Sequence, residues 1–189
     1  YADRKLFPNA LVLRTPMIGR VQARNAALAA LVTRYLGASI EHIQRGLATA
    51  GLRARFEIMQ GDPVVVLDGA HTPDSVRASA LDFSTIFPGG GLLLFGCAKD
   101  KQPRPLAREL AGVFSRVIVT RPGTFKESDV LSISRGFMEE GFQVTVLEDT
   151  EIGVRTALAE ASSAGLPLLV CGSFYLCAEM AKFLAARDR

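Results

Sequence analysis

Short apolar runs alternate with longer, helix-length stretches from residue 64 to residue 186, and this alternation limits the fold more narrowly than any other feature. The short runs, rich in Val, Leu and Ile, predict buried strands, and the stretches between them have the length of helices. The expected strands are residues 64–67, 92–95, 117–120, 143–147 and 166–170. The expected helices are residues 74–87, 103–111, 128–140, 151–163 and 174–186. Buried strands joined by helices require right-handed crossovers, so we predict an α/β fold in which helices cover both faces of a mostly parallel sheet.

One strand is expected to run against the others. Residues 55–60 alternate Phe56 and Ile58 with polar residues, which is the pattern of a half-buried strand. Gly61-Asp62-Pro63 then allows only a tight turn before the next strand. Because two strands joined by a tight turn pair antiparallel, the sheet should contain one antiparallel strand.

A short helical segment is expected to precede the sheet. Residues 20–36 predict a helix that ends at Gly37. Its apolar face is formed by Val21, Leu28, Leu31, Val32 and Tyr35. Ser39 should cap a second helix that runs through Ala50. Residues 10–13 could form a strand or the tail of a preceding domain, and a boundary at residues 51–53 divides the chain into regions 1–52 and 53–189.

The composition argues against several classes of protein. With 189 residues, 49% hydrophobic and 22% charged, the chain suits one large globular domain with a shorter piece attached. Its net charge of +3 includes no run of five basic residues, which argues against a nucleic-acid partner. No apolar run approaches the roughly 20 residues that a membrane span needs. Three cysteines without a CxxC pair favour a reducing, cytoplasmic setting. The first residue is Tyr1 and not Met, so we expect a piece of a longer protein.

Polar residues follow four of the expected strands at the point where each strand ends. These loops are residues 68–73, 96–101, 120–126 and 171–175. The first reads Asp68-Gly69-Ala70-His71-Thr72-Pro73. Ligands of open α/β sheets bind at the carboxyl ends of the strands. The sequence therefore predicts a site for a polyanion and an amino acid at this edge of the sheet.

Each polar residue also has a structural interpretation. Asp68 could cap the following helix, and Ser173 could cap the last one. His71 could be a hydrogen-bonded loop residue, and Lys99 and Lys101 could belong to a solvated turn. The chain has no GxxxxGK[ST] loop and no GxSxG elbow, so it cannot cradle a triphosphate alone and gives little support to hydrolase chemistry.

Five segments together resemble the folylpolyglutamate synthase/dihydrofolate synthase family, which belongs with the Mur ligases. Four of them are Arg55-Phe56-Glu57, the 68–73 loop, Asp100-Lys101 and the run of residues 172–176. The fifth, residues 19–29, is similar to the family's GxHQxxNAxxA segment. The resemblance implies that residues 53–189 form a Rossmann-like carboxy-terminal ligase domain, and that residues 1–52 are the tail of a central ATPase domain.

The activity implied by this resemblance is that of an ATP-dependent amide ligase. In such enzymes ATP and Mg²⁺ convert a carboxylate of folate or dihydropteroate into an acyl phosphate, which the amine of L-glutamate attacks. The phosphate-binding loop and the Mg²⁺ ligands are expected in a missing amino-terminal P-loop domain. This chain alone is therefore expected to be inactive and to hold no metal ligand.

The resemblance also assigns residues. Asn25, Arg55 and Lys101 match positions that bind the nucleotide. Asp68 matches a position that contacts the nucleotide and takes part in catalysis. His71 is matched to catalysis and to the incoming glutamate, and Ser173 to the glutamate.

Three residues depart from the family pattern, and two other functions stay open. Val21, Thr72 and Gln102 stand where His, Asn and an acidic residue are usual, and these departures concern the selectivity for glutamate. The first alternative is a Mur-type ligase that adds an amino acid to a peptidoglycan precursor. The second is a non-catalytic module that binds a nucleotide or an amino acid, because a shared fold does not fix function.

Overall fold

The computed structural model describes residues 6–7 and 9–187 and divides the chain into two compact units. Unit 1 is Tyr1–Arg53 and unit 2 is Ala54–Arg189. Within the described residues, no helix combines the length and the apolar character that crossing a membrane requires.

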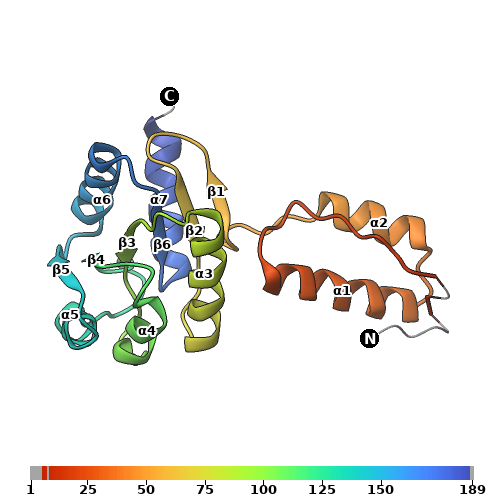
Figure 1. Ribbon diagram of the computed structural model, residues 1–189, viewed down its shortest axis with the longest axis horizontal. Helices are drawn as coiled ribbons and strands as arrows, with labels where there is room; N and C mark the ends of the chain where they lie inside the picture. Colours follow the sequence, from red (N-terminus) through yellow and green to blue (C-terminus); the bar gives the residue numbers. More distant parts are fainter. Residues whose placement is uncertain (1–5, 8, 188–189) are drawn as a thin grey trace. The chain divides into compact units, whose positions relative to one another are not determined.

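Unit 1 contains the two predicted helices, α1 (Arg20–Tyr35) and α2 (Ile40–Thr49) (Figure 1). Gly37 follows α1 with a φ of +94°, a conformation that glycine adopts at little cost. Ser39 caps α2, because its Oγ accepts the backbone N–H of His42 at 3.2 Å. Residues 10–13 form no strand, so that alternative is wrong.

The predicted apolar face of α1 is wrong. The side chains that α1 buries are those of Ala26 and Ala30, whereas Leu28 is 60% exposed and Tyr35 77% exposed. An alanine stripe allows a second helix to approach closely, and the periodicity of α1 contains both an alanine stripe and a stripe of larger residues. Periodicity alone could not decide which of the two is buried.

Unit 2 confirms the predicted sheet and its flanking helices. The strands are β1 (Glu57–Met59), β2 (Val65–Asp68), β3 (Leu92–Phe95), β4 (Arg116–Val119), β5 (Gln143–Val146) and β6 (Leu168–Cys171). The helices are α3 (Pro73–Ile86), α4 (Pro103–Leu110), α5 (Val130–Glu139), α6 (Thr150–Ala164) and α7 (Phe174–Arg187). The strand order is β1-β2-β6-β3-β4-β5. β1 pairs antiparallel with β2, and all other neighbouring strands are parallel.

The alternation of side chains along each strand builds two cores, one on each face of the sheet. Val66, Leu93 and Phe95 point into a core formed with α3, α4 and α5. Val65 and Leu94 point to the other face, into a core formed with α6 and α7. The result is a three-layer domain (Figure 1) in which all five parallel strands end at the same edge.

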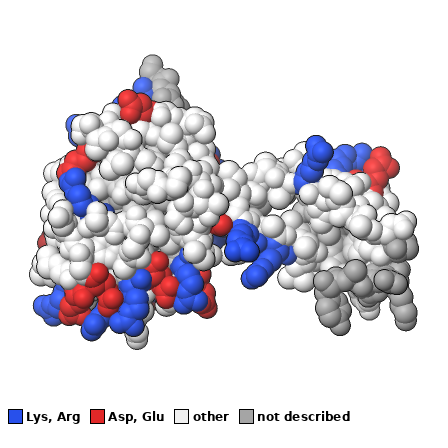
Figure 2. All heavy atoms as spheres, viewed as in Figure 1, with Lys and Arg blue, Asp and Glu red and all other residues white. Residues whose placement is uncertain are grey.

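Ion pairs cross between the helices that cover the first face. Arg77 of α3 pairs with Glu109 of α4 at 2.7 Å, and Arg104 of α4 reaches Glu140 just beyond α5 at 2.8 Å. Figure 2 shows the acidic and basic side chains intermixed over α4 and α5. Exposed pairs of this kind contribute about 0–1 kcal/mol each, so the packed cores account for most of the stability.

Candidate functional site

The strand order brings together two loops that are about a hundred residues apart in the sequence, those that follow β2 and β6. Asp68, the last residue of β2, lies opposite Cys171, the last residue of β6. The backbone N–H of Gly172 then donates to the carbonyl oxygen of Ala70 at 2.8 Å. The chain continues from β2 into α3 on one face and from β6 into α7 on the other, and ligands bind at such switch points.

The Asp68 carboxyl group is largely buried at this switch point. Its Oδ1 accepts the backbone N–H of Ala70 at 3.1 Å. Burial raises the pKa of Asp68 from 3.8 to about 6, although hydrogen bonds and the charge of Arg55 offset part of this effect. Because the charge change lies closer to neutral pH than is usual for a carboxyl group, Asp68 is a candidate for a functional role.

The capping interpretation of Asp68 is wrong. Helix α3 begins at Pro73, and its N-cap is Thr72, whose Oγ1 accepts the backbone N–H of Ser75 at 3.4 Å. The Ser75 hydroxyl accepts the backbone N–H of Thr72 at 3.0 Å in return. This capping box satisfies the start of the helix without Asp68.

His71 is partly exposed, and one of its ring nitrogens is already bonded. Nδ1 lies 2.7 Å from the carbonyl oxygen of Gly69. A carbonyl oxygen only accepts, so Nδ1 carries the hydrogen and the neutral ring keeps its lone pair on Nε2. Nδ1 is thus a hydrogen-bonded atom of the loop, as the structural interpretation of His71 expects. Nε2 can act as an acceptor or a base.

Arg55 is exposed and lies over an aromatic ring of the same site. Its guanidinium carbon is 4.6 Å from the centroid of the Phe174 ring, a distance at which a cation and a ring attract each other. The flanking residues Ala54 and Phe56 both have positive φ angles, +53° and +49°. Positive φ is uncommon for residues other than glycine and is strained for a residue as bulky as Phe. The backbone N–H of Ala54 donates to Oε2 of Glu57 at 2.9 Å, which helps to hold this loop.

The three remaining predicted residues lie in different places. Ser173 is buried between β6 and α7, and its Oγ accepts the backbone N–H of Tyr175 at 3.2 Å, as the capping interpretation requires. Lys101 follows β3, the strand next to β6, and pairs with Asp100 at 3.1 Å. Asn25 belongs to unit 1, where its amide donates to Gln22 at 3.2 Å. The structure thus brings Arg55 and His71 against the Phe174 ring. Asp68 ends the strand that leads to His71, Ser173 directly precedes Phe174, and Lys101 follows the next strand.

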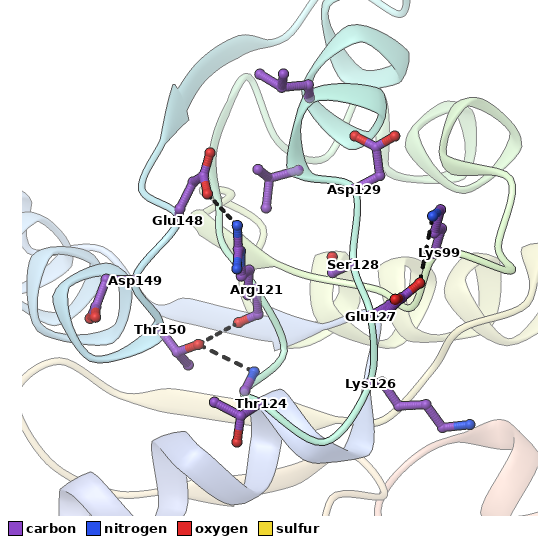
Figure 3. Close-up of a pocket in the computed structure, with 13 residues that line it drawn as sticks. Lys99, Arg121, Thr124, Lys126, Glu127, Ser128, Asp129, Glu148, Asp149 and Thr150 are labelled. Atoms are coloured by element: carbon purple, nitrogen blue, oxygen red, sulfur yellow. Dashed lines mark hydrogen bonds and ion pairs between the residues drawn. The ribbon is translucent and has the colours of Figure 1, made fainter.

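A cleft opens at a second switch point, between the ends of β4 and β5. Its volume is about 860 Å³. Arg121 and Glu148, which both line it, form an ion pair, and Thr150 donates to the carbonyl oxygen of Arg121 at 2.9 Å (Figure 3). The sequence predicts that the loop of residues 120–126 is polar, but it assigns no site residue in that loop. The sequence could not predict the cleft, because the cleft depends on α5 and α6 lying on opposite faces of the sheet. These helices follow β4 and β5.

No metal site is formed by the residues that the structure describes. Within residues 6–7 and 9–187, no three His, Cys, Asp or Glu side chains lie together in a way that could hold a metal ion. The polar groups of the site are instead suited to binding anions and hydrogen-bonding partners.

Comparison with known proteins gives one family and several relatives. Residues 54–174 match the family described as "Mur ligase, glutamate ligase domain". The chain is 36% identical over 166 residues to a probable bifunctional folylpolyglutamate synthase/dihydropteroate synthase of Halobacterium salinarum, covering 87% of this chain and 20% of that protein. It is 32% identical to the UDP-N-acetylmuramoyl-L-alanyl-D-glutamate–2,6-diaminopimelate ligase of Chromobacterium violaceum, covering 85% and 34%.

A solved structure shows the same fold. It is a folylpolyglutamate synthase of Mycobacterium tuberculosis complexed with ADP and AMPPCP, with a TM-score of 0.78 and 26% identity. The match covers 91% of this chain and 41% of that one. The chain therefore spans between 20% and 41% of the length of these three proteins.

Proposed function

Because the chain belongs to the Mur ligase family and contains its glutamate ligase domain, we propose that it is the carboxy-terminal part of an ATP-dependent amide ligase. The proposed substrates are L-glutamate and a carboxylate of folate or dihydropteroate. The observation that carries the proposal is the cluster of Arg55, Asp68 and His71 at the switch point between β2 and β6. The relative of H. salinarum and the structure from M. tuberculosis, both named as folylpolyglutamate synthases, support this branch of the family.

The reaction needs positive charge and fixed hydrogen bonds around the nucleotide. ATP supplies the phosphoryl group that turns the substrate carboxylate into an acyl phosphate, and phosphate leaves when the amine attacks. In this chain Arg55 offers a planar set of donors that can meet phosphate oxygens or stack on an adenine ring. Asp68 can accept hydrogen bonds from ribose hydroxyls. The residues at this site therefore suit a nucleotide.

His71 and Ser173 suit the incoming amino acid. With Nδ1 bonded to Gly69, the Nε2 lone pair of His71 can accept a hydrogen bond from the ammonium group of glutamate and take its proton. The Ser173 hydroxyl keeps its own hydrogen after accepting the N–H of Tyr175 and can donate it to a glutamate carboxylate. We assign both residues to binding glutamate, and His71 also to catalysis.

The rest of the proposed enzyme lies outside this chain. We propose that residues 1–52 are the tail of a central ATPase domain whose P-loop and Mg²⁺ ligands come from a preceding part of the protein. Asn25 and Lys101 would contribute to the nucleotide site. The exposed apolar residues of α1, such as Leu28 and Tyr35, would be covered by the rest of that domain. Such a ligase is expected to work in the cytoplasm.

A Mur-type ligase is the second candidate, because the relative from C. violaceum is named as a ligase that adds diaminopimelate. The two candidates share the fold and the nucleotide and differ in the amino acid and the acceptor. The folate branch has the support of the relative with the higher identity, 36% against 32%.

The test of the proposal is ligation by a longer protein that includes this chain and the preceding P-loop domain. His71→Asn keeps a donor for the Gly69 carbonyl but removes the Nε2 base, so we expect ATP-dependent ligation to fall by about 100-fold or more. His42→Asn, which changes the other of the two histidines, is the control. The 189-residue chain alone should show no ligation. If His71→Asn lowered activity only in proportion to stability, His71 would be a structural loop residue.

A further inference from the structure

Phe174 lies at the centre of the site, although the sequence assigned it no role. It is the first residue of α7. The Arg55 guanidinium lies over its ring, 4.6 Å from the centroid. The His71 ring meets it edge to face, with centroids 6.0 Å apart and planes inclined by 69°. One side chain therefore contacts both the proposed nucleotide residue and the proposed base.

Gly69 connects the same parts through its backbone. Its N–H donates to the carbonyl oxygen of Ala54 at 2.9 Å, next to Arg55. Its carbonyl oxygen accepts from Nδ1 of His71 at 2.7 Å. A Cβ atom at this position would lie 2.3 Å from two atoms of the Phe174 ring. The ring therefore packs directly on the backbone that anchors both Arg55 and His71.

The loop that contains Arg55 needs such a contact to keep its conformation. Ala54 and Phe56 hold positive φ angles on either side of Arg55, and backbone strain of this kind persists only where the surroundings fix it. Phe56 is buried in the core, which holds one side of the loop. The Phe174 ring holds the Arg55 side chain itself.

We propose that Phe174 is a positioning residue of the ligase site. Its ring fixes the Arg55 guanidinium toward the nucleotide, and it keeps His71 in the tautomer that leaves the lone pair on Nε2. The consequences for nucleotide binding and ligation rest on the proposed function, whereas the effect on the His71 ring does not.

The effect on His71 can be measured in the 189-residue chain by ¹⁵N NMR of the imidazole rings. In Phe174→Leu we expect the His71 ring shifts to move and the Nδ1–H tautomer to lose population, while His42 stays unchanged. Phe174→Tyr, which keeps the ring, should restore the wild-type His71 signals. Phe183→Leu is the matched control, because Phe183 lies on the same helix under Arg155 at 5.9 Å. If Phe174→Leu does not fold, Phe174→Met provides a second variant without the ring.

The effect on Arg55 is measured as the affinity of the longer protein for a non-hydrolysable ATP analogue. We expect Phe174→Leu to weaken binding by about 3- to 30-fold, the range that one cation–π contact supports. The double variant Arg55→Ala/Phe174→Leu should bind no more weakly than Arg55→Ala alone. Unchanged His71 signals in Phe174→Leu, or losses that multiply in the double variant, would overturn the proposal. If the His71 signals respond but the wild-type protein does not ligate, the proposed function fails and the positioning role stands.

Discussion

Adding one methyl group at Gly69 tests the packing of the site directly. In Gly69→Ala the new Cβ would lie 2.3, 2.3 and 2.6 Å from three atoms of the Phe174 ring. Since carbon atoms pack at about 3.5–4.0 Å, the ring must withdraw by about 1 Å or more. Gly69 does not have the left-handed backbone that only glycine tolerates easily, so the substitution acts through this clash alone.

Overpacking of this kind costs about 1–3 kcal/mol of unfolding free energy. For a unit of this size, that loss corresponds to a fall in Tm of about 3–12 °C. The assay is thermal and urea unfolding of the 189-residue chain, followed by circular dichroism. Gly89→Ala is the control, because its Cβ would have no heavy atom within 4 Å, and it should change stability by less than about 0.5 kcal/mol. If Gly69→Ala were as stable as Gly89→Ala, the described contact between Gly69 and Phe174 would be refuted.

Two further predictions concern the same edge of the sheet. The pKa of Asp68 is about 6 in the fold against an ordinary 3.8, so the folded state keeps a proton that the unfolded state releases between these values. Stability should therefore fall as the pH rises from about 4 to about 6, by on the order of 3 kcal/mol at most. Asp68→Asn should lose this dependence in urea unfolding at a series of pH values, and an unchanged pH dependence in the variant would contradict the assignment. Gly172 has a φ of +99°, and a Cβ there would lie 2.7 Å from the carbonyl oxygen of Gly96. Gly165 also has a positive φ, +61°, but a Cβ there would have no heavy atom within 4 Å. Gly172→Ala should thus destabilise the chain by about 1–3 kcal/mol more than Gly165→Ala, because it adds a clash to the same kind of backbone strain; equal losses would remove the clash from the account.

The fold could be predicted because its signals are local. Leu92–Phe95 is a run of apolar residues between a glycine cluster and Gly96, and the predicted and observed strand have the same bounds. The antiparallel β1 followed from the short turn at residues 61–63. The order of the strands could not be obtained in this way, because the position of β6 between β2 and β3 depends on packing between residues far apart in the sequence.

Only part of the site can be predicted from the sequence. Asp68 and His71 can be predicted because they lie at the end of a strand and in the loop that follows it. The sequence does not predict the capping box of Thr72 and Ser75, which removes the capping role of Asp68. The positive φ angles of Ala54 and Phe56 had no signal, because glycine is absent from both positions. The predicted apolar face of α1 is wrong for a different reason. Large apolar side chains give a stronger hydrophobic pattern than the alanine stripe of Ala26 and Ala30 that α1 buries.

The most direct test of the central claim is a competition between amino acids in the longer protein that contains this chain. L-glutamate, L-alanine, L-lysine and diaminopimelate would be offered with ATP and Mg²⁺, in the presence of folate, dihydropteroate or a UDP-linked peptidoglycan precursor. We predict ATP-dependent transfer of glutamate to folate or dihydropteroate above that of any other pair. Preferential addition of another amino acid to the peptidoglycan precursor, or the absence of any ATP-dependent ligation, would contradict the account.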